Sequence, residues 1–153
     1  MPDLRFETAT SVDVAVSSVR FHGATNATAE PAVVQAPAWF VAYQIERHLE
    51  EARRLAAHAG DVPASARAEA TMAELLGVVV RSPDIDAEVQ GTEEGGLVLV
   101  ADNFHARRRV IFEVDPGGAE ILIKRVDDRQ VVRRAVRTGG YHPAGEIRWI
   151  RGQ

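Results

Sequence analysis

The stretch from Ile85 to Val126 constrains the fold more than any other part of the chain. It consists of short apolar runs, and each run is closed by a turn signal. Within most runs, apolar and polar side chains alternate with the period of a half-buried strand. The turn from Asp115 to Gly118 (DPGG) favours a hairpin, because proline fixes φ and glycine accepts positive φ. We therefore predict a meander of antiparallel strands over this stretch.

Two helices are predicted ahead of the meander. The first spans residues 37–59, has one apolar stripe, and is followed by Gly60, a typical stop residue. The second spans about 64–76, with Ser65 as a plausible N-cap. Residues 78–80 (VVV) fit either the tail of this helix or a short strand.

The two ends of the chain are harder to assign. Residues 1–36 alternate with period two in places, which indicates an extended N-terminal β segment or arm. Residues 129–137 fit a strand or a helix, and their repeated β-branched side chains favour the strand, entered through a two-residue turn at Asp127-Asp128. Residues 146–150 fit a last short strand or a docked tail.

These assignments predict an α+β fold: an antiparallel β-meander sheet of five to seven strands, with two helices packed mainly on one face. A chain of 153 residues is most simply one compact domain, with 1–36 as its N-terminal segment and 37–153 as its α+β body. The sequence has no apolar run long enough to span a bilayer and no signal-peptide pattern, so no membrane partner is expected. Together with the lack of cysteine, this predicts a cytoplasmic protein.

Part of the chain resembles a known class of proteins. The matching pieces are Gly95 to Leu99 (GGLVL), Val110 to Val114 (VIFEV) and the DPGG turn after them, with a helix ahead. Over residues 65–126 the chain is similar to small uncharacterised bacterial proteins of toxin–antitoxin or defence-locus type. The resemblance implies a partner protein in such a system, and it carries over no functional residue.

No set of residues predicts catalysis, a metal or a cofactor. The five histidines include no i,i+4 pair on the predicted helices, and no serine lies in a nucleophile motif. Asp84, Asp86 and Glu88 lie on one side of a predicted strand, as in some Mg²⁺ sites. A nuclease would add an acid two residues before the lysine, but Leu122 precedes Lys124, the one lysine in the chain. We predict a solvated strand face there, and no enzyme.

Charge is unevenly distributed along the chain. Residues 103–153 carry a net charge of +5 and residues 1–102 a net charge of −9, within a total of −4. The two halves either neutralise each other within one fold or attract a charged partner. Six arginines are candidates for a nucleic-acid-binding face: Arg107, Arg108, Arg109, Arg133, Arg134 and Arg137.

Aromatic residues at the start of the first helix suggest a second kind of surface. Trp39, Phe40 and Tyr43 point in different directions around the helix axis, so one stripe cannot bury all three. They are either packed between the sheet and the N-terminal segment or form a protein interface, where such side chains are favoured. We expect a non-enzymatic protein–protein interaction module, a small subunit or accessory factor that binds another protein or itself. Nucleic-acid binding through the arginines is the alternative.

Overall fold

The structure is a computed structural model, and it describes residues 36–153. Residues 1–35, which make up nearly all of the predicted N-terminal segment, lie outside the described residues. By their contacts, residues 42–153 form one unit of the chain.

Two helices precede the sheet, as predicted. Helix α1 spans Ala38–Ala59, and Gly60 follows it with a φ of +79°, a conformation that glycine adopts without strain. Helix α2 spans Ala66–Val79, and the Ser65 side chain caps it by accepting a hydrogen bond from the Ala68 amide. The helix continues past Gly77, so residues 78–79 are its tail rather than a strand.

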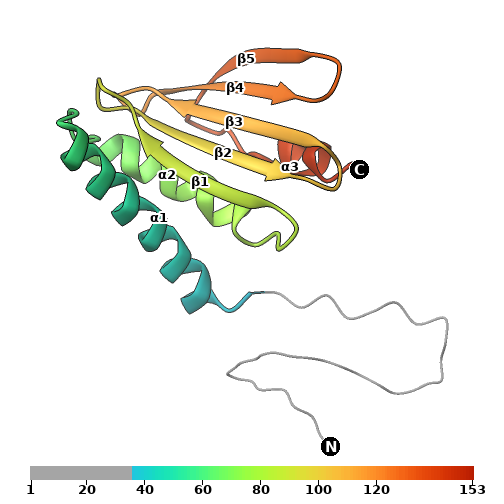
Figure 1. The fold of residues 1–153 in the computed structure, drawn as a ribbon, viewed down its shortest axis with the longest axis horizontal. Helices are drawn as coiled ribbons and strands as arrows, with labels where there is room; N and C mark the ends of the chain where they lie inside the picture. The colour runs from blue at the N-terminus through green and yellow to red at the C-terminus, as the bar shows by residue number, and fades with distance from the viewer. Residues whose placement is uncertain (1–35) are drawn as a thin grey trace, which may run out of the picture. The chain divides into compact units, whose positions relative to one another are not determined.

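Five strands then follow in chain order and form one antiparallel sheet in the order β1-β2-β3-β4-β5 (Figure 1). Their bounds are Asp86–Gly91, Leu97–Asn103, Arg108–Val114, Glu120–Val126 and Val131–Arg137. The predicted α+β class and the predicted meander are therefore confirmed, and the ambiguous segment 129–137 is a strand. Each strand pairs with the one before it because short turns return the chain beside itself.

Two details near the C-terminus differ from the predictions. The connection between β4 and β5 is the four-residue stretch 127–130, closed by a hydrogen bond from the Asp127 amide to the Gln130 carbonyl, and not a two-residue turn. Residues 146–150 are not a strand but belong to helix α3, Ala144–Ile150, which packs against β3. A helical turn buries both Ile147 and Ile150, because side chains three apart lie on the same face.

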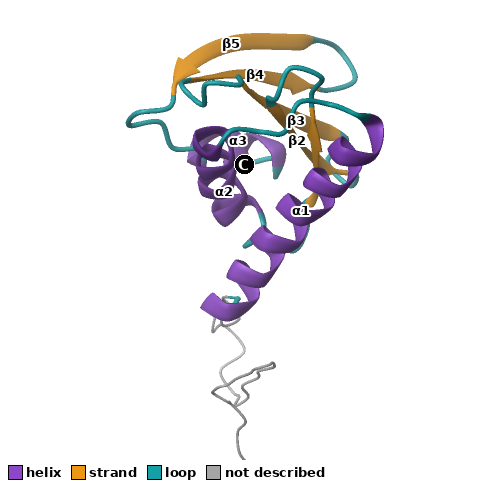
Figure 2. Cartoon of the chain, turned by 90° about the vertical axis from the view of Figure 1, so that its left-hand side faces the viewer, coloured by secondary structure: helices purple, strands orange, loops and turns teal. Residues whose placement is uncertain are grey.

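The sheet has one buried face and one open face. On the buried face, Leu99 and Phe112 are fully covered and pack with Met72 and Leu76 of α2. Figure 2 shows α2 and α3 on this side of the sheet, beneath its strands. Among residues 42–153, no helix lies over the opposite face, which we call the outer face (Figures 1 and 2). An antiparallel sheet tolerates such one-sided cover because its outward side chains are normally polar.

Candidate functional site

The outer face carries more apolar side chains than is usual for a solvent-exposed face of an antiparallel sheet. Strand register places its side chains in three rows that cross all five strands, and in a shorter fourth row formed by Glu120 and Arg137 on β4 and β5. The middle row runs from Glu88 through Val100, Ile111 and Lys124 to Arg133. Seven apolar side chains lie on this face: Val98, Val100, Ile111, Leu122, Val126, Val131 and Ala135.

The centre of the outer face is an apolar patch between two ion pairs. Ile111 of the central strand β3 lies at its middle, and it is partly exposed although it faces no helix of the unit. On one side of Ile111, Glu113 pairs with Lys124 across β3 and β4. On the other side, Arg109 makes a bidentate pair with Asp102, with N···O distances of 2.7 and 3.0 Å. A patch rimmed by charged groups is typical of a protein interface.

The two lateral edges of the outer face carry opposite charge. Strand β1 contributes Asp86 and Glu88, and strand β5 contributes Arg133 and Arg137. All four side chains are exposed, and none forms an ion pair within the part of the chain that the structure describes. The outer face is therefore acidic along β1, apolar in the middle and basic along β5.

The six predicted nucleic-acid candidates are not gathered on one surface. Arg133 and Arg137 lie on the outer face, as their alternation on a strand predicts. Arg109 also lies there but is paired with Asp102. Arg107 lies in the turn between β2 and β3, 3.4 Å from Asp128. The remaining two, Arg108 and Arg134, turn to the helical side of the sheet.

A buried carboxylate engages the arginines on that helical side. The Glu146 side chain, in α3, is 1% exposed and accepts a 2.7 Å hydrogen bond from the Arg125 guanidinium. The Arg134 guanidinium reaches both of its oxygens at 3.1 Å, and the Tyr141 hydroxyl donates to one of them. These contacts join α3, β4, β5 and the loop between β5 and α3 through one side chain.

The same contacts set the titration of this cluster. Burial by itself raises the pKa of Glu146, but hydrogen bonds from Tyr141, Arg125 and Arg134 outweigh it and hold that pKa below its ordinary value. Burial, followed by donation to the Glu146 carboxylate, raises the pKa of the Tyr141 hydroxyl. The cluster therefore holds an ionised glutamate and a neutral tyrosine at neutral pH, which suits a structural tie between elements.

Trp149 of α3 is contacted by two arginines, Arg108 and the Arg125 that also binds Glu146. The Arg108 guanidinium lies 4.9 Å from the centre of its ring and donates a hydrogen bond to its carbonyl. The Arg125 guanidinium lies 5.3 Å from the same ring centre. Cation–π contacts of this kind, together with the Glu146 tie, commit Arg108, Arg125 and Arg134 to packing within the fold.

The predicted aromatic interface residues differ in exposure. Trp39 is 65% exposed and Tyr43 is 57% exposed, while Phe40 is partly buried. The Trp39 and Phe40 rings meet edge to face, with their centres 5.9 Å apart. Two of the three predicted residues are thus available at the surface of α1 itself.

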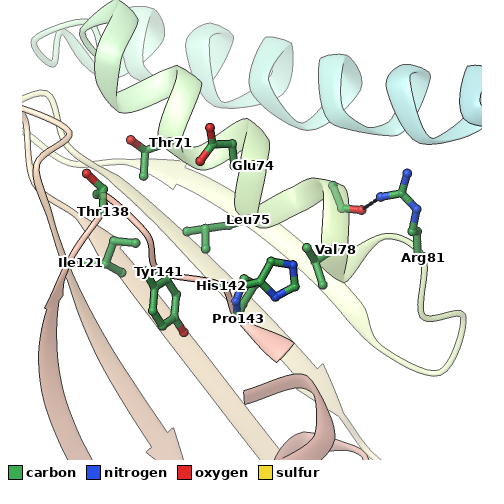
Figure 3. A pocket seen from close by; sticks show the side chains of 11 residues that line it. Thr71, Glu74, Leu75, Val78, Arg81, Ile121, Thr138, Tyr141, His142 and Pro143 are labelled. Atoms are coloured by element: carbon green, nitrogen blue, oxygen red, sulfur yellow. Dashed lines mark hydrogen bonds between the residues drawn. The ribbon is translucent and has the colours of Figure 1, made fainter. Parts of the chain in front are cut away.

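One cavity opens on the helical side of the sheet. It measures about 270 Å³ and lies between α2, β4 and the loop that leads to α3 (Figure 3). Thr71 and Glu74 line it from α2, and Thr138, Tyr141 and His142 line it from the loop. The Arg81 side chain, which also lines it, donates a hydrogen bond to the Gly77 carbonyl. The cavity is partly open and its polar groups do not converge on one point (Figure 3).

The acidic residues considered for a metal site do not come together. Asp86 and Glu88 share the outer face, but Asp84 precedes the strand and bonds to Arg151 at 3.3 Å. Within residues 36–153, no three His, Asp or Glu side chains are grouped closely enough to hold a metal ion. No helix among these residues is both long and apolar enough to cross a membrane.

Comparisons with known proteins found no relative of this chain. The chain matches no family model, no curated protein and no solved structure. The resemblance to bacterial toxin–antitoxin or defence-locus proteins stays a prediction.

Two features of the site were missed in the sequence, although signals for both are present. Residues 97–101 are apolar at every position, a pattern typical of a central strand; such a strand also leaves Val98 and Val100 on a face that no helix of the unit covers. Glu146 is the only acid between residues 129 and 153, among six arginines. An isolated acid in a basic segment indicates an internal ion pair.

Proposed function

We propose that this protein is a non-enzymatic interaction module, a small subunit or accessory factor that binds a protein through the outer face of its sheet. The observation that carries the proposal is the apolar patch around Ile111 on a sheet face that no helix of the unit covers. The exposed side chains of Trp39 and Tyr43 on α1 are further candidate contacts for a partner protein.

Physical chemistry supports a bound protein at this face. Burial of apolar surface contributes about 25 cal/mol per Å², and a well-packed patch with a charged rim combines affinity with orientation. Half-buried Val, Ile and Leu side chains lose little conformational entropy on binding, because the sheet already holds their backbone. The ion pairs Glu113–Lys124 and Arg109–Asp102 add polar groups whose partners are already in place, so binding leaves them satisfied.

The test compares partners of the wild-type chain with those of an outer-face variant. The tagged full chain is expressed in its native host, and proteins retained in stoichiometric amount are identified by mass spectrometry, with an untagged copy of the chain counted as a partner. We expect Ile111→Lys to lose the retained protein, since a charge in the apolar patch opposes its burial. Arg148→Glu, an exposed change on α3, is the matched control and retains it.

Two results would reject the proposal. One is a wild-type chain that retains no protein, its own copy included. The other is an Ile111→Lys variant that is folded and retains the same protein in the same amount. Unfolding midpoints of both variants, measured by circular dichroism, separate a lost interface from a lost fold.

A further inference from the structure

We propose that the protein bound at the outer face is a second copy of this chain, packed face to face about a twofold axis parallel to the strands. The inference rests on the proposed function and deepens it, because it names the partner and its orientation. The charge distribution of the face, its symmetry and its area all favour such a pair.

The charge distribution is complementary to itself. Asp86 and Glu88 lie along one lateral edge of the outer face, and Arg133 and Arg137 lie along the other, with the apolar patch between them. A partner of opposite distribution must be basic where this face is acidic, and acidic where it is basic. A second copy of the same face, turned so that its edges are exchanged, has that distribution.

Symmetry determines which rotation exchanges the edges. A twofold axis that lies between the sheets and runs parallel to the strands places β1 of one copy over β5 of the other. It therefore brings Glu88 of each copy towards Arg133 of the partner copy, while Ile111 of the central strand lies near the axis and meets its own copy. An axis perpendicular to the strands instead stacks β1 on β1, acid on acid, and β5 on β5, and like charges without a partner of opposite charge disfavour it. The parallel axis also brings like charges together on β3, but Arg109 and Glu113 are each already paired within their own chain.

The size of the face suits a dimer. Five strands at a spacing of ~4.8 Å, each of about seven residues at ~3.4 Å, cover roughly 24 by 24 Å before side-chain relief is counted. The resulting surface is of the order of the ~800 Å² per partner that specific interfaces bury. Aligned face-to-face packing of two sheets is also a common arrangement, with apolar side chains interdigitating between them.

The strand edges favour this face over edge-to-edge pairing. Strand β5 carries three arginines in seven residues, and β1 carries Asp86 and Glu88. Charged side chains on edge strands oppose the addition of another strand. The apolar patch on the outer face is free of this obstacle, and a second copy therefore binds there rather than at an edge.

A charge-reversal experiment tests the orientation. Analytical ultracentrifugation measures the dissociation constant of the full-length dimer for wild type, for Glu88→Arg and for Arg133→Glu. Each reversal opposes like charges at both symmetry-related contacts, so each variant alone dimerises roughly tenfold or more weakly than wild type. An equimolar mixture of the two variants restores opposite charges at both contacts, and we expect it to form a heterodimer of near wild-type affinity.

Matched controls exclude general effects of charge. Glu74→Arg on α2 and Arg148→Glu on α3 make the same reversals on exposed positions of the helical side, and they leave the dimer unchanged. All variants are compared by circular dichroism and by unfolding midpoint. If a reversal reduces folding, Glu88→Gln and Arg133→Gln replace it, with a smaller weakening of the dimer as the expected result.

Each outcome decides the inference. A monomeric wild-type chain overturns it, as do single reversals that dimerise like wild type, or a mixture that forms no heterodimer. If the chain is monomeric but retains another protein through contacts that depend on Ile111, the second-copy inference is overturned and the proposed function stands. If it retains a nucleic acid in this way instead, both are overturned. Both are also overturned if neither self-association nor any retained protein depends on Ile111.

Discussion

The Glu146 side chain connects helix α3 to two strands and to the loop before the helix. Its buried carboxylate is bound by Arg125 on β4, Arg134 on β5 and Tyr141 in the loop before α3. A buried charge is stabilising only when its partners are complete, because desolvation otherwise exceeds the electrostatic gain. Here the partners are complete, and the two arginines are partly exposed, which lowers the cost of desolvation. The cluster therefore stabilises the packing of α3 against the sheet edge.

Removing this charge is expected to destabilise the fold. Glu146→Gln loses two ion pairs, and it leaves partly buried guanidinium groups with one weaker acceptor. We expect the free energy of unfolding to fall by about 1 to 3 kcal/mol, since Arg125 and Arg134 retain some contact with water. Urea denaturation measures the change, and Glu74→Gln at an exposed position of α2 is the control, with an expected change under about 0.5 kcal/mol. Equal stability of the two variants would contradict the role given to Glu146.

The pH dependence of stability gives a second readout of the same residue. Because the folded pKa of Glu146 is below its ordinary value of 4.5, its stabilisation is fully present above that value. The stabilisation is lost as pH falls through the folded pKa. The difference in unfolding free energy between wild type and Glu146→Gln is therefore constant from about pH 5 to 7 and shrinks below about pH 4. A difference that grows on acidification would show that the sign is wrong.

At the scale of elements, the hairpin between β3 and β4 is fitted to the start of α2. The Ser65 hydroxyl donates a 2.7 Å hydrogen bond to the Pro116 carbonyl, and the Thr71 hydroxyl donates one of 3.1 Å to the Gly118 carbonyl. Gly118 has a φ of +70°, and a Cβ there would lie 2.7 Å from the Arg67 carbonyl carbon. The turn and the helix therefore approach more closely than any side chain at position 118 permits.

The glycine requirement can be measured by substitution. Gly118→Ala combines positive φ with a clash against helix backbone, and we expect it to lower the free energy of unfolding by at least about 2 kcal/mol. Gly117→Ala is the matched control in the same turn: its Cβ would meet only the Asp115 carboxylate, at 3.3 Å. Thermal unfolding followed by circular dichroism compares the two. A Gly118→Ala protein as stable as Gly117→Ala would show that α2 and the hairpin are not in this contact.

The predictable elements are those whose signals are local. The strands of the meander and both long helices follow from side-chain periodicity and from turn and cap residues such as Ser65, Gly60 and the DPGG sequence. Helix α3 was not predicted, because in seven residues the apolar pattern of a strand and that of a helix look alike. Its helical state depends on contacts distant in sequence, those of Glu146 with Arg125 and of Asn103 with the Ile150 carbonyl.

At the scale of the whole molecule, the fold rearranges the charge that the sequence distributes between its two halves. The basic and acidic halves of the sequence partly neutralise each other through pairs such as Arg109–Asp102 and Arg151–Asp84. What is left on the outer face is an ordered arrangement, acidic along β1 and basic along β5. Composition alone did not predict this, because it depends on which strand of the sheet each charge occupies and on the face to which it points.

The site was predicted less well than the fold for the same physical reason. The sequence names candidate side chains by type, and the structure shows that Arg108 and Arg134 pack against Trp149, Tyr141 and Glu146 within the fold. Only strand register identifies Ile111 as the centre of an uncovered patch. Register depends on how neighbouring strands pair, and this pairing cannot be derived from the type of each residue taken separately.

The measurement that tests the outer face most directly is photo-cross-linking from its centre. The chain has no cysteine, so Ile111→Cys provides a single site for a benzophenone maleimide. The labelled full chain is irradiated in extract of its native host, and adducts are identified by mass spectrometry, with Arg148→Cys as the control site on α3. We predict an adduct from position 111 to another protein molecule, a second copy of this chain, that is absent from position 148. The account is contradicted if position 111 yields no intermolecular adduct, or only those that position 148 also yields.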